Sequence, residues 1–446
     1  MGIYTTLRGK SVEAQDFLFN FLLSRLAAPP NQATMTPRAL RCVLGCDASR
    51  RQLLRAPSSS YRRSYFPTPA VSKKAWDPSL EEYKYWNRES SKHGEASYRL
   101  DMSPESVQRE ARILCLASPD DVANGPLTNP SSGGLPFGSR LLSVGTQPTD
   151  FPDSLIGERP NVLFVSPSCP HARLQLPLMV HKFPTIEWIH VRSAGIDFLE
   201  SDELPGVAKK GIIVTNAKGQ FSSSLAEYAM LACSYFAKNV PLLLRQQGSR
   251  SWNDFEIEEL RGRTMGIVGY GDIGRATARL ASAYGMRIVA LRRNPQRSAL
   301  DPLCDEVYGT GRADLRRLMG ASDYVVCSAP STVETRGMVD ADAFASSKAD
   351  QVFINLGRGP VVDEDALVAS LRGGKLRGAA LDVFATEPLP EDHELWGMDN
   401  VLISPHNMDK TSTFMHEATE FFVRENLPRF ILGDSLLNPV DASLGY

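Results

Sequence analysis

Three charged side chains that could bind a small acid and transfer a proton follow short apolar runs in the C-terminal part of the sequence. Arg358 follows VFINLG, Glu387 follows GAALDVFAT, and His406 follows NVLISP. Arginine can bind a carboxylate through two parallel hydrogen bonds, and histidine exchanges a proton near neutral pH. A carboxylate beside the histidine would raise its pKa and orient its ring. Taken singly, Arg358 could be a surface ion pair and His406 a loop histidine, so the prediction rests on all three.

A glycine-rich turn, GYGDIG at 269–274, lies between an apolar run, TMGIV, and a helical pattern, RATARLASAY. In such a turn the first glycine permits the tight bend, the second lets a pyrophosphate approach, and the third allows close strand–helix packing. The N-terminus of the following helix offers free N–H donors to phosphate. A turn without ligand is the alternative, but the strand–turn–helix setting favours a dinucleotide. The predicted contacts in the turn are Gly269, Gly271, Asp272, Ile273 and Gly274.

The end of the second strand of this unit bears on which dinucleotide binds. A carboxylate about 20 residues after the glycines would bind the ribose of NAD. Here Arg292 and Arg293 stand at that place, Arg292 being 18 residues after Gly274, and no carboxylate accompanies them. Guanidinium groups can bind a 2′-phosphate. The sequence therefore favours NADP, with NAD still possible and a solvated basic loop as the alternative.

Short apolar runs alternate with helical patterns from about residue 111, which is typical of parallel sheets covered by helices. Residues 222–246 read as one long helix interrupted by Pro241, with a serine at 222–224 as its N-cap. Another helix is expected to begin at Asp363 and to stop at Gly373–Gly374. The sequence thus predicts an α/β protein.

Composition narrows the classes of protein. The 446 residues carry 49 basic and 51 acidic side chains, for a net charge of −2, which argues against a nucleic-acid-binding protein. No run approaches 18 apolar residues, so no membrane-spanning helix is expected. Seven scattered cysteines indicate free thiols in a reducing compartment, and no second CxxC or histidine pair completes a metal site.

The N-terminal part of the chain differs in composition from the rest. Residues 35–71 contain seven arginines, several serines and a single acid, Asp47. This composition is typical of an organelle transit peptide and predicts a mitochondrial location. A disordered tail, or a true start at Met35 with a cytoplasmic protein, are the alternatives. Residues 76–105 are charged and read as a linker.

The order of the motifs resembles the D-isomer-specific 2-hydroxyacid dehydrogenase family over roughly residues 110–440. The matching segments are RSAGIDFLE, GIIVTN, LAEYAM, RGRTMGIVGYGDIGRATA, INLGRGPVVDEDALVASLRGGKLRGAALDVFATEPLP and NVLISPH. The resemblance implies two Rossmann-like domains with parallel sheets and a discontinuous substrate domain. The implied segments are an N-terminal extension at 1–105, the first part of the substrate domain at 106–220, the cofactor domain at 221–404 and a return to the substrate domain at 405–446.

The resemblance also implies a role for each site residue. Arg358 would bind the substrate carboxylate and polarise the keto oxygen, His406 would be the general acid or base, and Glu387 would hydrogen-bond His406. The backbone N–H groups of Ala194 and Gly195 would help to hold the carboxylate. The remaining implied contacts are to the cofactor, with Asp382 facing the nicotinamide and Leu356 and Gly357 lining its site.

The implied activity is reduction of a small 2-keto acid to a D-2-hydroxy acid by a homodimer, with glyoxylate or hydroxypyruvate as the leading substrate. Departures from the family pattern at Ser328–Ala329 and Asn407–Met408 put the substrate in question. Trp252 is expected to pack in the core. The rival class is an NAD(P)(H)-responsive, corepressor-like binding protein without physiological turnover, since some relatives keep the same three residues.

Overall fold

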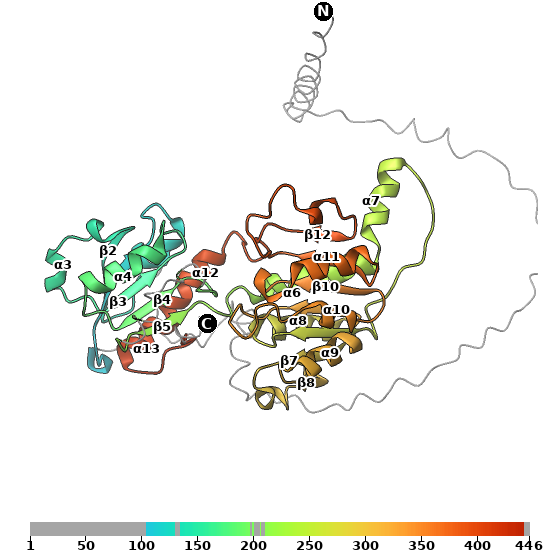
Figure 1. Cartoon of the computed structure of the whole chain (residues 1–446). Coiled ribbons are helices and arrows are strands. Elements are labelled where there is room, and N and C mark those ends of the chain that lie inside the picture. The colour runs from blue at the N-terminus through green and yellow to red at the C-terminus, as the bar shows by residue number, and fades with distance from the viewer. Residues whose placement is uncertain (1–103, 130–133, 197–198, 200–205, 207–209, 441–446) are drawn as a thin grey trace, which may run out of the picture. The chain divides into compact units, whose positions relative to one another are not determined.

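Two parallel β-sheets, each covered by helices, make up the part of the chain that the structure describes (Figure 1). The computed structural model describes residues 104–129, 134–196, 199, 206 and 210–440. The predicted transit segment, and the linker up to residue 103, lie outside these ranges. None of the described helices combines the length and apolar character that crossing a bilayer requires.

The first sheet has the order β2-β1-β3-β4-β5, with all neighbours parallel. Its strands are β1 Ala111–Leu116, β2 Ser139–Gly145, β3 Val162–Val165, β4 Trp188–Val191 and β5 Ile213–Asn216. Helix α4, Ala172–Lys182, packs on one face, and the C-terminal helical segment from Phe422 to Leu432 packs on the other. Shorter helices here are η3 Pro104–Ser106, η4 Val122–Asn124, α2 Gly125–Thr128, η6 Pro148–Asp150, α3 Ser154–Gly157, α12 Phe414–Phe421, the π-helical η11 Phe422–Asn426 and α13 Leu427–Leu432.

The second sheet has the order β12-β11-β10-β9-β6-β7-β8 and is also parallel. Its strands are β6 Thr264–Val268, β7 Arg287–Leu291, β8 Glu306–Tyr308, β9 Tyr324–Cys327, β10 Gln351–Asn355, β11 Leu376–Leu381 and β12 Val401–Ile403. Its helices are α6 Ser222–Ala237, α7 Val240–Ser249, α8 Asp272–Ala283, η8 Pro295–Ser298, α9 Arg312–Ala321, α10 Ala341–Ala345, η9 Gly359–Val361, α11 Glu364–Arg372 and η10 Glu394–Gly397. The predicted α/β class with parallel sheets is confirmed.

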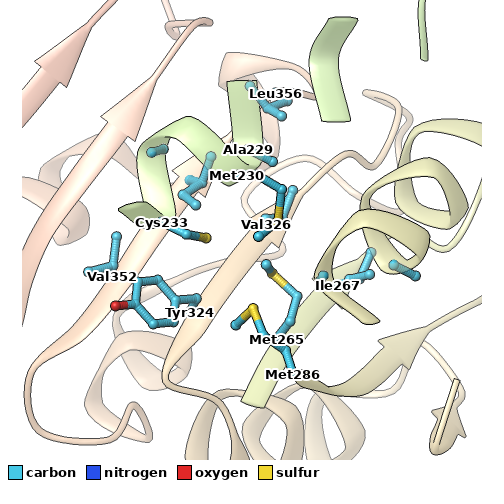
Figure 2. Close-up of a cluster of buried hydrophobic side chains, with 14 of the residues drawn as sticks. Ala229, Met230, Cys233, Met265, Ile267, Met286, Tyr324, Val326, Val352 and Leu356 are labelled. Atoms are coloured by element: carbon cyan, nitrogen blue, oxygen red, sulfur yellow. The ribbon is translucent and has the colours of Figure 1, made fainter. Parts of the chain in front are cut away.

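Successive residues of the central strands pack into opposite layers of the second core. Tyr324 and Val326 of β9 belong to the cluster beneath α6 and α8, together with Met265 and Ile267 of β6 (Figure 2). Val325, one residue along β9, belongs to the cluster beneath α9, α10 and α11. Burial on both faces explains why these strands are uniformly apolar rather than alternating.

The long helix expected at 222–246 is two helices. Asn239 takes a left-handed conformation with φ of 49°, and Pro241 lies in the first turn of α7, where its missing N–H costs nothing. The expectation of a serine N-cap was wrong, because the cap position is Phe221 and no side chain caps α6. The N-cap at Asp363 is confirmed by a 3.0 Å hydrogen bond that its carboxylate accepts from the N–H of Ala366.

The expectation that Trp252 packs in the core was also wrong. Its side chain is fully exposed, in a segment that follows α7. Every residue of α7 itself is at least partly exposed. The apolar residues of this region therefore do not contribute to the core of the described chain.

A buried histidine on β4 links the stability of the first sheet to pH. His190 Nδ1 lies 2.8 Å from Thr215 Oγ1, and its Nε2 has no partner among the described residues. Burial lowers the pKa of His190 to about 3. The folded protein thus holds this imidazole neutral at pH values where an unfolded chain would protonate it.

We expect His190 to make the protein less stable as the pH falls below the ordinary histidine pKa. Between about pH 7.5 and pH 5, the wild type should lose about 2 kcal/mol more unfolding free energy than His190→Asn. Urea denaturation at the two pH values measures the difference, with His181→Asn on the exposed face of α4 as control. Equal losses in wild type and His190→Asn would contradict the assignment.

Candidate active site

The three residues predicted to be catalytic follow three adjacent strands at one edge of the second sheet. Arg358 comes after β10, Glu387 after β11 and His406 after β12, and these strands are neighbours in the order β12-β11-β10. The carboxyl ends of parallel strands form the ligand-binding edge of such sheets. The topology therefore brings together residues that are up to 48 positions apart in the sequence.

Glu387 and His406 form a direct pair. His406 Nδ1 lies 2.7 Å from Glu387 Oε2, and the other oxygen of Glu387 accepts a 3.0 Å hydrogen bond from the N–H of Phe384. His406 has a φ of 49°, an uncommon backbone conformation for a residue with a side chain. Since Glu387 binds Nδ1, the Nε2 of His406 is the nitrogen left for a ligand.

The pKa values of His406 and Glu387 are shifted in the directions that proton donation by the histidine requires. The hydrogen bond to Glu387 raises the pKa of His406 above its ordinary value, although burial acts against this. Burial also opposes ionisation of Glu387, but hydrogen bonds from His406 and from the N–H of Phe384 hold the Glu387 pKa below its usual range. Both shifts act in favour of an imidazolium beside a carboxylate.

Asp382 fixes the turn that carries His406. Its buried carboxylate accepts hydrogen bonds from Ser404 Oγ at 2.7 Å and from the N–H groups of Asn407 at 3.1 Å and Met408 at 3.4 Å. These three donors lie on both sides of His406 in the sequence. Asp382 thus holds the histidine turn to the end of β11.

Arg358 lies where its charge acts on both members of the pair. It lowers the pKa of Glu387 and opposes the rise in the pKa of His406. Its Nη1 donates to the carbonyl of Gly357 at 2.8 Å, and the side chain of Asn355 accepts from the N–H of Gly357 at 3.2 Å. Sequence reasoning missed Asn355 and Ser404, although both stand in the motifs that contain Arg358 and His406.

The glycine turn after β6 has the space and the packing that were predicted for it. Gly269 has a φ of +97°, and a Cβ there would lie 2.7 Å from the backbone nitrogen of Ala329. A Cβ on Gly274 would lie 2.6 Å from the carbonyl oxygen of Gly269, whereas one on Gly271 would meet no atom within 4 Å. The turn also precedes α8, which begins at Asp272. Open space at the second glycine beside a helix N-terminus fits a pyrophosphate.

The turn lies at the point where the order of the strands reverses, between β6 and β9. Ser328, directly after β9, donates its hydroxyl to the carbonyl of Gly269 at 2.8 Å. Gly357 packs closely against Ala329, while the side chain of Leu356 is buried in the core. Of these two predicted cofactor contacts, Leu356 could therefore contribute only its backbone.

Arg292 and Arg293 lie at the end of β7. Arg292 is partly buried, and its guanidinium donates to Ser298 Oγ in the connection that follows. Arg293 is half exposed, with its Nε 4.0 Å from Glu334 Oε2. Both cations thus stand at the strand end where a dinucleotide places its ribose.

Ala194 and Gly195 follow β4, on the first sheet rather than the second. Within the described ranges, their N–H groups donate to no other residue. In the part of the chain that the structure describes, no cluster of three or more histidine, cysteine or acidic side chains could hold a metal ion.

The carboxyl edge of the second sheet thus carries a glycine turn that fits a dinucleotide. It also carries Arg358, Glu387 and His406, whose side chains are of the types that bind a carboxylate and exchange a proton. The model of the NAD binding domain of D-isomer specific 2-hydroxyacid dehydrogenases matches residues 229–407. A glyoxylate reductase from Thermofilum pendens is 33% identical over 257 residues, which cover 56% of this chain and 74% of the relative.

Solved structures of D-isomer specific 2-hydroxyacid dehydrogenases and related reductases are also similar to this chain. A D-isomer specific 2-hydroxyacid dehydrogenase from Xanthobacter autotrophicus, in complex with NADPH and MES, is 27% identical with a TM-score of 0.61, covering 76% of this chain and all of that one. An NADPH-dependent glyoxylate/hydroxypyruvate reductase from Sinorhizobium meliloti, with NADP and malonate, is 27% identical with a TM-score of 0.56 and covers 75% and 98%. The chain belongs to the D-isomer specific 2-hydroxyacid dehydrogenase family and is an oxidoreductase that uses a nicotinamide cofactor.

Two alanine variants of the glycine turn test the cofactor site. Gly271 has extended backbone angles, so Gly271→Ala should fold with an unchanged melting temperature yet bind NADPH weakly, because its methyl group fills the space for the pyrophosphate. Gly269→Ala should instead lower the melting temperature, because its φ and its contact with Ala329 leave no room. Thermal unfolding and fluorescence titration with NADPH measure both effects. If Gly271→Ala binds NADPH with wild-type affinity, the pyrophosphate does not bind at Gly271 and the predicted site is wrong.

Proposed function

We propose that the protein reduces a small 2-keto acid to a D-2-hydroxy acid, with glyoxylate or hydroxypyruvate as substrate. The observation that carries the proposal is the 2.7 Å pair of His406 and Glu387 with Arg358 beside it. The glyoxylate reductase relative and the structure of the glyoxylate/hydroxypyruvate reductase support this choice of substrate.

Each residue then has a defined role in the reaction. The guanidinium of Arg358 and the N–H groups of Ala194 and Gly195 bind the substrate carboxylate, because both are donors suited to its oxygens. A bound nicotinamide supplies the hydride for the keto carbon. His406 gives a proton from Nε2 to the keto oxygen, and Glu387 stabilises the imidazolium before transfer. Asp382 keeps the His406 turn in place.

We propose that the first sheet belongs to the substrate domain and the second to the cofactor domain. Residues 106–220 and 405–446 would form the former, and residues 221–404 the latter. The packing of α13 and η11 against β1, β3 and β4 supports a chain that returns after His406.

A homodimer is the assembly we propose for the protein. Exposed apolar side chains lie on α6, on α7 and in the segment after α7, where a second copy could cover them: Leu231, Leu243, Leu244, Trp252 and Ile257. Association of two copies through this region would remove these apolar side chains from water.

A mitochondrial location rests on the composition of residues 35–71 alone. Import of a reporter fused to residues 1–75 tests it. A reporter that stays in the cytosol would favour a start at Met35 or an untargeted tail.

Turnover separates the proposed enzyme from the rival NAD(P)(H)-responsive binding protein. The protein is incubated with NADPH and a panel of 2-keto acids that includes glyoxylate, hydroxypyruvate and pyruvate, and the absorbance of NADPH is followed. Reduction of glyoxylate or hydroxypyruvate at ordinary enzyme rates supports the proposal. Cofactor binding without turnover of any keto acid would favour the binding protein.

Removing the charge of Glu387 should move the pH dependence of reduction. His406 must be protonated to reduce a keto acid, so the rate falls as the pH rises through its pKa. Glu387→Gln removes the charge that raises this pKa, so the fall should occur at lower pH. Rates against pH are compared with those of Glu420→Gln, which alters the carboxylate beside His416 on α12. An unshifted profile, with chemistry shown to limit the rate, would separate Glu387 from His406.

Arg292 should decide the preference for NADPH. Arg292→Asp should lower the ratio of NADPH to NADH affinity by at least about tenfold, because a charge-assisted contact to the 2′-phosphate is lost and a repulsive charge appears. Fluorescence titrations of both cofactors measure the ratio. Arg297→Asp, which replaces an exposed arginine of the same connection, is the control for the change in net charge. A wild type that binds both cofactors equally would refute the preference.

A further inference from the structure

A buried arginine stands directly before the predicted carboxylate-binding loop of the first sheet. Arg192 follows the last residue of β4 and precedes Ala194 by two positions, and its side chain is 1% exposed. Its N–H donates to the carbonyl of Val165 at 2.9 Å and so extends the pairing of β4 with β3. An arginine is seldom buried unless its charge is paired.

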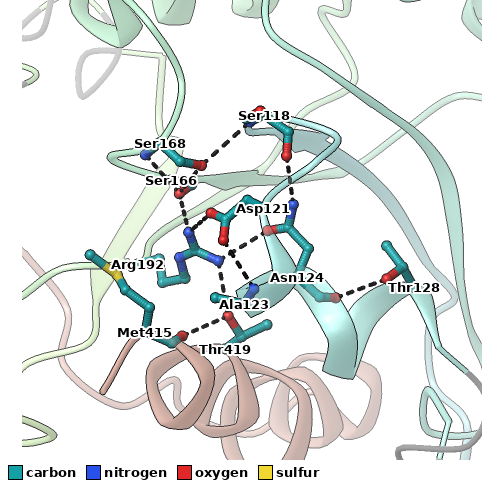
Figure 3. Close-up of polar contacts among 10 residues, drawn as sticks. All are labelled: Ser118, Asp121, Ala123, Asn124, Thr128, Ser166, Ser168, Arg192, Met415 and Thr419. Atoms are coloured by element: carbon teal, nitrogen blue, oxygen red, sulfur yellow. Dashed lines mark hydrogen bonds and ion pairs between the residues drawn. The ribbon is translucent and has the colours of Figure 1, made fainter. Parts of the chain in front are cut away.

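The guanidinium of Arg192, at the end of β4, contacts four side chains from three other segments of the chain (Figure 3). One terminal nitrogen binds the carboxylate of Asp121 and the hydroxyl of Ser166. The other donates to Asn124 Oδ1 at 3.0 Å and to Thr419 Oγ1 at 3.4 Å. These acceptors lie after β1, after β3 and on α12, so a single planar group ties the carboxyl edge of the sheet to the segment that returns after His406.

The acceptors are themselves held in place. Asp121 caps η4 by accepting from the N–H of Ala123 at 3.0 Å, and Asn124 donates to the carbonyl of Ser118 at 3.0 Å. Burial acts to raise the pKa of Asp121, but hydrogen bonds from Ser168 and Arg192 hold it below its usual value. The network is therefore an ion pair within a set of fixed hydrogen bonds rather than a mobile surface contact.

The peptides after Arg192 are oriented so that their N–H groups face away from β5. The carbonyl of Ser193 accepts from the N–H of Ala217 at 2.9 Å, and the carbonyl of Ala194 accepts from Asn216 Nδ2 at 2.6 Å. In a planar trans peptide, the N–H points opposite to the carbonyl of the same unit. The N–H groups of Ala194 and Gly195 thus point away from the residues at the end of β5.

We propose that Arg192 is a positioning residue for this loop. Its guanidinium sets the start of the loop, and Asn216 with Ala217 sets its two carbonyls, so that both N–H groups present a fixed pair of donors to a carboxylate. The inference rests on the proposed function, since it assigns the substrate carboxylate to Ala194 and Gly195. Lysine cannot replace Arg192, because an ammonium lacks the planar fork that reaches four acceptors in different directions.

The test is Arg192→Lys compared with Arg109→Lys. Arg109 is a partly exposed arginine that lies just before β1, at the opposite, amino-terminal side of the same sheet. Arg109 lies over the ring of Phe430 at 4.2 Å and donates to its carbonyl, so the control also removes an arginine fork. We measure kcat, the KM for glyoxylate, the inhibition constant of malonate, the NADPH dissociation constant and the melting temperature of each variant.

In Arg192→Lys we expect the KM and the malonate constant to rise at least about tenfold, as on loss of one charge-assisted hydrogen bond. The NADPH constant should stay within about twofold, because Arg192 shares no hydrogen-bond partner with the residues predicted to bind the cofactor. Arg109→Lys should change the melting temperature without changing KM. Asp121→Asn keeps the shape of the pair and should raise KM in the same direction.

A folded Arg192→Lys with wild-type KM and malonate affinity would overturn the proposal, because the network would then serve the fold alone. If Arg192→Lys does not fold, Asp121→Asn decides by the same two constants. If the wild type reduces no keto acid, the proposed function fails on its own, and malonate binding by calorimetry still reports whether Arg192 shapes an anion site.

Discussion

The parallel pairing of β6 with β9 is the constraint on which the second sheet depends. Its register places Val268 opposite Cys327, so the chain leaves both strands at the same level. Gly269 then lies against Ala329, where a Cβ would be 2.7 Å from backbone, and Gly357 meets the same residue from β10. The connections after β6, β9 and β10 meet at Ala329. They can approach so closely because the first and the third have glycine there, Gly269 and Gly357. This pairing thus places the glycine turn at the point where the strand order reverses, which is where sheets of this kind bind ligands.

The pairing of His406 with Glu387 also depends on the carboxyl edge of the second sheet. The connections after β10, β11 and β12 carry Arg358, Glu387 and His406, each a few residues beyond its strand. The distances between these residues therefore follow from strand pairing rather than from local sequence. Strand pairing alone leaves the turns loose. Asp382 removes that freedom by accepting three hydrogen bonds around His406. The left-handed φ of His406 is maintained by those contacts, in the manner expected of a backbone strain held by its surroundings.

The sequence could predict those features that are determined by local chemistry or by the order of strands along the chain. The glycine turn, the cap at Asp363 and the grouping of residues at strand ends are of this kind. The serine cap of α6 was wrong, because all three serines lie inside the helix and the cap position falls on Phe221, whose side chain has no acceptor. The exposure of Trp252 could not be read from its type, since aromatic residues usually pack inside. The contacts of Arg192 join positions 121, 166 and 419, and no spacing rule connects them.

The charges around His406 act against one another, and the proposed substrate would change their balance. Glu387 raises the pKa of the imidazole and Arg358 opposes the rise. A keto acid bound to Arg358 brings a carboxylate that neutralises this opposing charge, so the imidazolium is held more firmly once substrate is present. In the proposed mechanism, substrate binding at Arg358 would therefore also raise the pKa of His406. The same argument explains why Arg192, whose charge is already paired with Asp121, can shape the site without disturbing its proton balance.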